Sequence, residues 1–249
     1  VGVGAGFTPR FGHLPYVMGE GNKKLSKRDP QANLLGYRDE GFLPEGLLNY
    51  LGRLGWSYGD QEIFSLEEMT QLFDIHDVNK SASALNLDKM LWTNQQHMLR
   101  STPEHLATYL KPQLEALGLV ADDMAKVAAV AKAQQERAKT LKEMAANSQF
   151  FFRDVTSYDE KAAKHVSAET SPILKAARDR LAALPEWRAP AVHVAIMAVA
   201  AEQGVGLGKV AQPIRVAVSG GTVSPPIDVT LEILGRETTL ARLDRALAL

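Results

Sequence analysis

Apolar residues recur at spacings of three and four positions along almost the whole chain after about residue 31. This is the period of an amphipathic α-helix, and segments with the strict alternation of a β-strand are hard to find. Conventional start and stop residues flank many of these periodic segments, so the helices can be placed one by one. The pattern therefore predicts an all-α fold.

Two helix starts are marked by residues that cap free backbone amides. Residues 65–68 read Ser-Leu-Glu-Glu, which is the pattern of a capping box, and they predict a helix that begins there. We expect the buried face of this helix to consist of Leu66, Met69, Leu72 and Phe73. Thr102 and Pro103 predict a second start, with proline at the first helical position, and Gly118 is placed to end that helix.

A long alanine-rich segment runs from Asp122 to about Ala146. Alanine, lysine, glutamate and glutamine, which dominate it, all favour the helix intrinsically. A narrow apolar stripe follows the helical period at Val127, Ala131, Ala138, Leu141 and Ala145. We therefore predict one continuous helix over these residues.

The last eighty residues contain several further helix signals. Prolines at 172 and 190 open two helices, the second of which is the apolar run 192–201. Three short helices separated by glycines are predicted at 209–218, 226–234 and 238–247. Together they indicate a compact helical bundle. The composition changes near Ser101 and again across 150–170, and we expect domain boundaries there.

Composition narrows the classes of function. With 249 residues the chain can bury a substantial core, and with a formal net charge of -1 it can bind a polyanion only through local basic patches, which disfavours non-specific binding to DNA. The absence of cysteine excludes disulfides and thiolate zinc sites and fits the cytoplasm. No apolar run is long enough to predict a membrane span, and no secretory signal is present.

The most informative motif is the sequence KLSKR at 24–28, in a glycine-dotted loop. Asp29 and Pro30 follow it, and then come the strings GFLPEGLLNYL at 41–51 and LGWS at 54–57. In this order the three pieces resemble the mobile nucleotide loop and the following segment of bacterial glutamyl-tRNA synthetases, which are class I aminoacyl-tRNA synthetases. Taken alone, the pentapeptide could also be a solvated basic turn.

The resemblance implies roles for three residues of this loop. Lys27 would contact the phosphates of ATP, Lys24 would assist, and Ser26 would form a hydrogen bond nearby. Lysine suits this chemistry because its ammonium is a compact charge on a flexible stem, which can follow the negative charge that develops as pyrophosphate leaves. ATP with Mg²⁺ is the expected cofactor set, with no zinc site, since the six histidines are dispersed.

A second match lies almost two hundred residues further along the chain. The string KVAQPIRVAVSG at 209–220, then Ser224 and Pro225, is similar to the terminal anticodon-binding module of the same synthetases. The resemblance places Arg215, Ser224 and Ile227 at positions that meet anticodon bases, and Arg137 on a helix that faces the last of them. Unstacked bases are read by hydrogen bonds and stacking, and arginine offers a planar fork of donors. The alternative interpretations are helix-surface arginines, an N-cap serine and a core isoleucine.

We therefore interpret the chain as the C-terminal part of a glutamate–tRNA ligase, which attaches glutamate to tRNA(Glu), with tRNA(Gln) as a further candidate partner. The expected segments are a catalytic-domain remnant (1–28), a helical stem-contact-like domain (29–101) and two anticodon-binding subdomains (102–165 and 166–249). Such a piece would bind tRNA without catalysis, because the catalytic half with its His-x-Gly-His motif is missing. The competing hypotheses are a helical protein-interaction scaffold and a related enzyme such as glutaminyl-tRNA synthetase.

Overall fold

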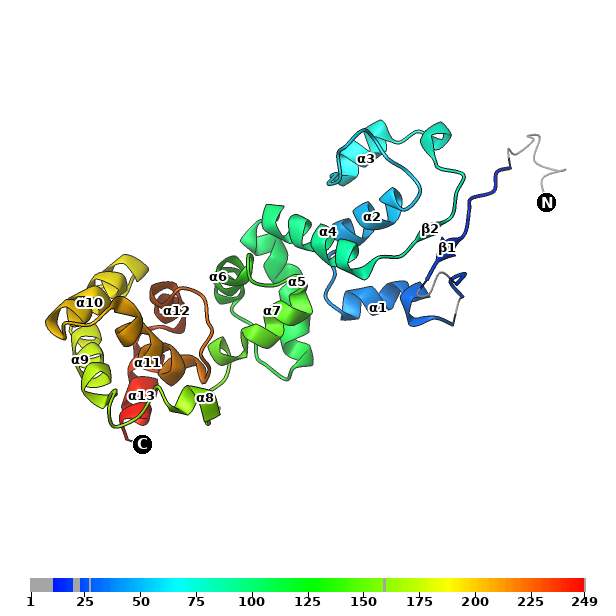
Figure 1. The fold of residues 1–249 in the computed structure, drawn as a ribbon. Coiled ribbons are helices and arrows are strands. Elements are labelled where there is room, and N and C mark those ends of the chain that lie inside the picture. Colours follow the sequence, from blue (N-terminus) through cyan, green and yellow to red (C-terminus); the bar gives the residue numbers. More distant parts are fainter. Residues whose placement is uncertain (1–10, 20–22, 27, 159, 249) are drawn as a thin grey trace. The chain divides into compact units, whose positions relative to one another are not determined.

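The computed structural model describes residues 11–19, 23–26, 28–158 and 160–248. The described residues fold into α-helices, with two strands of two residues each, which confirms the predicted all-α class. They divide into two compact units, the first ending at Arg100 and the second beginning at Ser101 (Figure 1). None of the described helices is both long enough and apolar enough to cross a membrane.

The first unit is built around two helices that pack on each other, α2 and α4. Its elements are β1 (Val17–Met18), α1 (Leu34–Asp39), α2 (Pro44–Arg53), α3 (Leu66–Leu72), β2 (Ser83–Ala84) and α4 (Leu87–Arg100). The strands pair in parallel, with Val17 opposite Ser83. Gly46 permits the close approach of α2 to α4, because a Cβ there would lie 2.7 Å from Oδ1 of Asn94. That oxygen also accepts a hydrogen bond from the backbone N–H of Leu43 at 2.8 Å.

The capping box at the start of α3 is confirmed, but the predicted buried face is wrong. Ser65 and Glu68 exchange both capping hydrogen bonds. Leu66 is 61% exposed and Phe73, which lies beyond the end of the helix, is 52% exposed. Helical spacing predicted this face, but this helix of seven residues contains no buried residue; it approaches α2 at Gly52, where a Cβ would lie 2.5 Å from Cε of Met69.

The second unit contains α5 to α13. Their bounds are α5 (Pro103–Ala116), α6 (Met124–Gln134), α7 (Leu141–Asn147), α8 (Glu160–Ala163), α9 (Ser171–Ala182), α10 (Ala189–Glu202), α11 (Leu207–Ser219), α12 (Ile227–Leu234) and α13 (Arg236–Leu247). The predicted start of α5 is confirmed, since the Thr102 hydroxyl accepts a hydrogen bond from the N–H of His105. Gly118 follows its end with φ of +73°, a conformation that favours glycine.

The single long helix predicted over 122–146 is wrong, because the chain turns between α6 and α7. Thr140 caps α7 by accepting a hydrogen bond from the N–H of Glu143 at 3.1 Å. The carboxylate of Glu143 accepts from the N–H of Lys139 at 2.8 Å. Thr140 and Glu143 thus have the spacing of a second capping signal, which the helix-favouring composition around them concealed.

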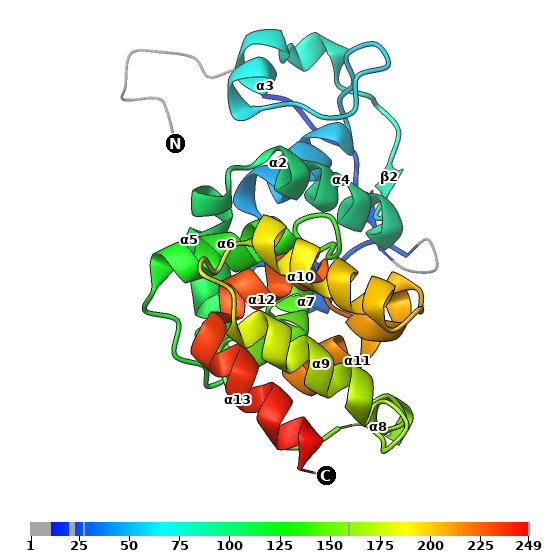
Figure 2. The ribbon, with the colours of Figure 1, turned by 90° about the vertical axis from the view of Figure 1, so that its left-hand side faces the viewer.

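The C-terminal bundle matches the helices predicted for it. Helix α9 packs against α10 and α13, and α11 packs against α10 and α13 (Figures 1 and 2). Their fully buried side chains form the core of this bundle: Leu174, Leu181, Val192, Ile196, Ile214, Leu231 and Leu243. Helix α12 also contacts α6. The turn that follows α6 therefore lies near the end of α11 and the start of α12, and residues of these segments line the same grooves.

Candidate functional site

Of the three residues predicted in the lysine loop of the first unit, the structure describes Lys24 and Ser26. Lys24 forms an antiparallel bridge with Met18, and its Nζ lies 3.6 Å from the centroid of the exposed Tyr16 ring. A cation above an aromatic face is held by the ring's negative face without losing its charge. Lys27 lies outside the described residues. Lys24 therefore presents an ammonium at the surface, resting on a ring.

Ser26 is tied into the turn that follows the loop. Its N–H donates to the carboxylate of Asp29 at 2.5 Å, and its carbonyl accepts from the Asp29 N–H at 3.0 Å. The Ser26 hydroxyl accepts a long hydrogen bond from the N–H of Arg28 at 3.3 Å. This reciprocal pairing fixes the backbone ahead of the 3-10 turn at Pro30–Ala32, and it leaves the hydroxyl exposed as a further donor.

Arg215, on α11, is half-buried and its guanidinium is held by two side chains. Nε donates to Oγ of Ser224 at 3.0 Å, and Nη1 donates to Oε1 of Gln212 at 2.5 Å. Gln212 is fixed in turn, because its Nε2 donates to the carbonyl of Thr222 at 3.0 Å. Neither partner is a carboxylate, and Arg215 makes no ion pair with any described residue. The fork is therefore oriented while its charge stays uncompensated.

Ser224 does not cap α12. Its hydroxyl accepts from Arg215 and donates to the carbonyl of Pro225 at 2.8 Å, while the N-cap position belongs to Pro226. Ile227 is 7% exposed and packs in the core of the bundle. The structure thus places Ser224 beside Arg215 and Ile227 beneath the loop that carries both Ser224 and Pro226.

Arg137 was expected on a helix, but it lies in the turn after α6. There it is exposed and lies near enough to Arg215 for its charge to act on it. Burial, and after it the positive charge of Arg137, lowers the pKa of Arg215 from its usual value. Two like charges held near each other without a carboxylate favour an anion between them.

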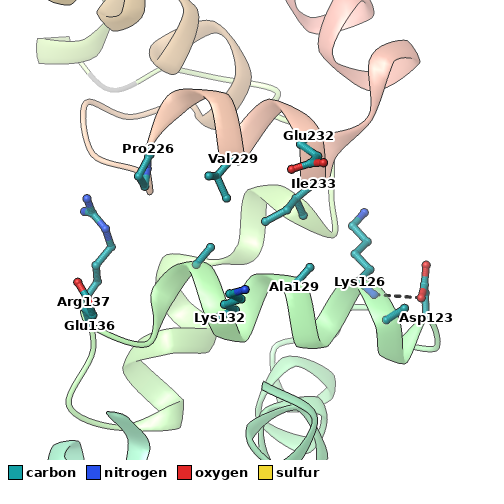
Figure 3. Close-up of a pocket in the computed structure, with 12 residues that line it drawn as sticks. Asp123, Lys126, Ala129, Lys132, Glu136, Arg137, Pro226, Val229, Glu232 and Ile233 are labelled. Carbon is teal, nitrogen blue, oxygen red and sulfur yellow. Dashed lines mark hydrogen bonds between the residues drawn. The ribbon is translucent and has the colours of Figure 1, made fainter. Parts of the chain in front are cut away.

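Two grooves of the second unit meet at Arg137. One, of about 760 Å³, lies between α6 and α12, and Figure 3 shows Arg137 at one end of it, reaching toward Pro226. The other, of about 910 Å³, is more polar and includes Ser224, Arg153 and the end of α11. Of the residues predicted from the sequence, Arg137, Arg215 and Ser224 are thus brought together.

Sequence reasoning missed three basic residues of these grooves. Lys126 and Lys132 line the first groove and Arg153 the second. None of them is near a recognisable motif, and Arg153 lies in the periodicity-poor stretch that indicates only a boundary. Among the described residues, no group of three or more histidine, aspartate or glutamate side chains is arranged to hold a metal ion.

Comparisons with known proteins agree with this geometry. The family described as the anticodon binding domain matches residues 104–247, and the catalytic domain of class I (E and Q) tRNA synthetases matches residues 5–92. Glutamate–tRNA ligase 1 of Alkalilimnicola ehrlichii is 52% identical over 240 residues, which are 96% of this chain and 51% of that protein. Glutamate–tRNA ligase 1 of Nitrosococcus oceani is 52% identical over 241 residues, with the same coverage.

Solved structures give the same result. The glutamate tRNA ligase of Elizabethkingia meningosepticum, solved with its amino acid, superposes with a TM-score of 0.83 at 31% identity, over 97% of this chain and 52% of that one. The chain spans about half the length of the relatives it matches. The predicted resemblance to glutamyl-tRNA synthetases is confirmed, and the chain belongs to the anticodon binding domain family.

Proposed function

We propose that the second unit of this chain binds tRNA(Glu) by its anticodon, as the tRNA-reading part of a glutamate–tRNA ligase that acts in the cytoplasm. One observation carries the proposal. Arg137, Arg215 and Ser224 come from three separate segments and converge beside the polar groove, and neither arginine forms an ion pair with a described carboxylate.

Fixing the fork of Arg215 favours base recognition over simple charge attraction. Nε and Nη1 are occupied, so the remaining donors of the guanidinium have a defined direction. A planar, oriented donor can pair with the edge of an unstacked base or stack on its face. Arg137 would meet a neighbouring base, Ser224 would hold the fork, and the buried Ile227 would contribute only the apolar edge that the loop leaves open.

The lysine loop would serve the other end of the reaction. We propose that Lys24, Ser26 and Lys27 act on the phosphates of ATP, with Lys27 as the direct contact, in the whole ligase. Mg²⁺, when bound with ATP, would neutralise phosphate charge. The residues of this chain would add a movable ammonium at Lys24 and a hydroxyl donor at Ser26. Since the chain spans half of its relatives, it would bind tRNA without charging it.

A mobility-shift titration with purified tRNA(Glu) tests this function. We expect a shift that weakens with salt, because phosphate contacts release counterions. A tRNA(Glu) with a changed anticodon should bind more weakly, and tRNA(Gln) tests the breadth of recognition. The same chain mixed with ATP, glutamate and tRNA should form no glutamyl-tRNA. Equal affinity for the natural and the changed anticodon would refute the proposal.

A further inference from the structure

The segment between α7 and α8 is a third wall of the polar groove. Phe150, Arg153 and Val155 line this groove together with Arg137 and Ser224. Val155 also packs against Gly220 at the end of α11, where a Cβ would lie only 3.1 Å from Val155 Cγ1. Gly220 has φ of +80°, so glycine suits both the turn and the close contact.

A buried arginine of α13 holds this segment in place. Arg242 is 3% exposed, and its Nη1 donates to the carbonyls of Phe150 at 2.8 Å and Val218 at 2.5 Å. Its Nη2 donates to the carbonyl of Arg153 at 2.9 Å. One guanidinium thus fixes the wall segment to the C-terminal end of α11.

Arg242 is an unusual choice for a position inside a helix bundle. Its nearest carboxylate, on Asp154, lies 3.8 Å away and is largely exposed, and its Nε has no hydrogen-bond partner among the described residues. Burying a cation is costly, and hydrogen bonds to neutral carbonyl oxygens offset that cost less fully than a buried carboxylate partner would. The neighbouring Arg245 adds a hydrogen bond from Nη1 to the carbonyl of Val155 at 2.7 Å. Two arginines therefore hold the backbone carbonyls of Arg153 and Val155 and lie near the carboxylate of Asp154 between them.

The first residue of this segment, Arg153, is itself a cation. The side chain of Arg153 is exposed in the groove, and it makes no hydrogen bond or ion pair with any described residue. We propose that Arg153 contacts a backbone phosphate of the bound RNA, and that Arg242 is the positioning residue that presents it. This inference rests on the proposed function, since the RNA is the tRNA bound at Arg215.

Phosphate contact has a signature that base recognition lacks. Arg153→Ala should weaken binding equally for tRNA(Glu) and for the tRNA with a changed anticodon. Loss of one phosphate contact on a single strand lowers the salt slope of log K by about 0.7, so the ratio of wild-type to variant affinity should fall roughly 2.5-fold between about 50 and 200 mM salt. The matched control is Arg180→Ala, an exposed arginine of α9 that lines neither groove.

The result separates this inference from the function on which it rests. If Arg153→Ala behaves like Arg180→Ala while Arg215→Ala weakens binding, the Arg153 contact is refuted and the proposed function stands. If neither Arg153→Ala nor Arg215→Ala changes binding, both are refuted.

Arg242→Lys tests the positioning role, because lysine keeps the charge but has a single nitrogen, which cannot take the places of both Nη1 and Nη2 of the guanidinium. We expect it to lower the salt slope as Arg153→Ala does, and the double variant to lose no more than either single variant. Additive losses would refute positioning. Circular dichroism identifies any variant that does not fold, and Arg242→Gln is then the substitute, with the same expected slope.

Discussion

The two candidate sites of the chain use cations in opposite ways. In the first unit, Lys24 is exposed and its ammonium rests on the ring of Tyr16. In the second unit, Arg215 is half-buried and two hydrogen bonds set the plane of its guanidinium. Neither cation has a carboxylate partner among the described residues, so each keeps its charge available.

The difference matches what each ligand requires. A phosphate group can be approached by a cation from many directions, so a flexible ammonium at the surface is enough to bind it. A base edge accepts hydrogen bonds only in its own plane, so the donor must be held before the base arrives. Under the proposed function, the same unit charge would serve two kinds of recognition, and the surrounding structure would decide which.

If the groove depends on a packed support, core changes beneath it should have the largest effect. Leu231→Ala on α12 removes a fully buried side chain and should lower the free energy of unfolding of the second unit by about 2–5 kcal/mol. Leu25→Ala, in the partly exposed lysine loop, should cost less than about 1 kcal/mol, since little area is buried there. Urea denaturation followed by hydrogen exchange in each unit measures both, and similar losses would contradict the comparison.

The next largest difference between the two sites should appear in tRNA affinity when the cation of each site is substituted. Arg215→Ala should weaken tRNA(Glu) binding by about 1–3 kcal/mol, the range for a residue that meets a base edge. Arg215→Lys should lose nearly as much, because an ammonium cannot replace an oriented fork. Lys24→Ala is the contrasting variant and should leave the affinity for tRNA unchanged. Full recovery of binding by Arg215→Lys would show that only the charge matters.

Acid should destabilise the first unit before the second. His97 on α4 is buried, with Nε2 2.8 Å from Oδ1 of Asn49. Burial lowers the pKa of His97, while Glu45 raises it and Arg100 lowers it further. As the pH falls below about 6.5, His97 therefore binds a proton in the unfolded chain before it does so in the folded one. The free energy of unfolding of the first unit then falls by at most about 1.4 kcal/mol per pH unit.

The buried cation of the second unit, Arg242, does not titrate in this range. Hydrogen exchange from about pH 8 to 5.5 should therefore show weaker protection in α2 and α4 and little change in α11 and α13. His97→Gln should remove most of this pH dependence. Parallel loss of protection in both units would contradict the assignment.

The smallest effect is expected from the residue that orients the fork. Ser224→Ala removes the acceptor of Arg215 Nε and should weaken tRNA binding by about 1 kcal/mol, the net value of one hydrogen bond. Isothermal titration calorimetry can resolve this loss. In the background of Arg215→Ala the same substitution should have no further effect, and a full additional loss would separate Ser224 from the fork.

Local sequence signals predicted much of the fold, but contacts between distant segments could not be predicted from them. The caps at Ser65 and Thr102 were found because capping is decided within four residues. The break before Thr140 carried the same kind of signal but was masked by its alanine-rich surroundings. The position of Arg137 beside Arg215 depends on how α6 and α12 pack, which no local pattern encodes.

Arg242 offers a partial exception. It falls in the helical spacing of the buried residues of α13, with Thr239, Leu243 and Ala246. A cation at a core position of an amphipathic helix indicates a buried structural role. What this spacing could not give is its partners, the carbonyls of Phe150, Arg153 and Val218, because they come from distant parts of the chain.

Nucleotide-resolution footprinting of tRNA(Glu) tests the central claim most directly. We predict that the wild-type chain protects the anticodon nucleotides, that Arg215→Ala loses this protection, and that Lys24→Ala retains it. A footprint that leaves the anticodon accessible, or one that is unchanged in Arg215→Ala, would contradict the claim that Arg215, beside the polar groove, reads the anticodon.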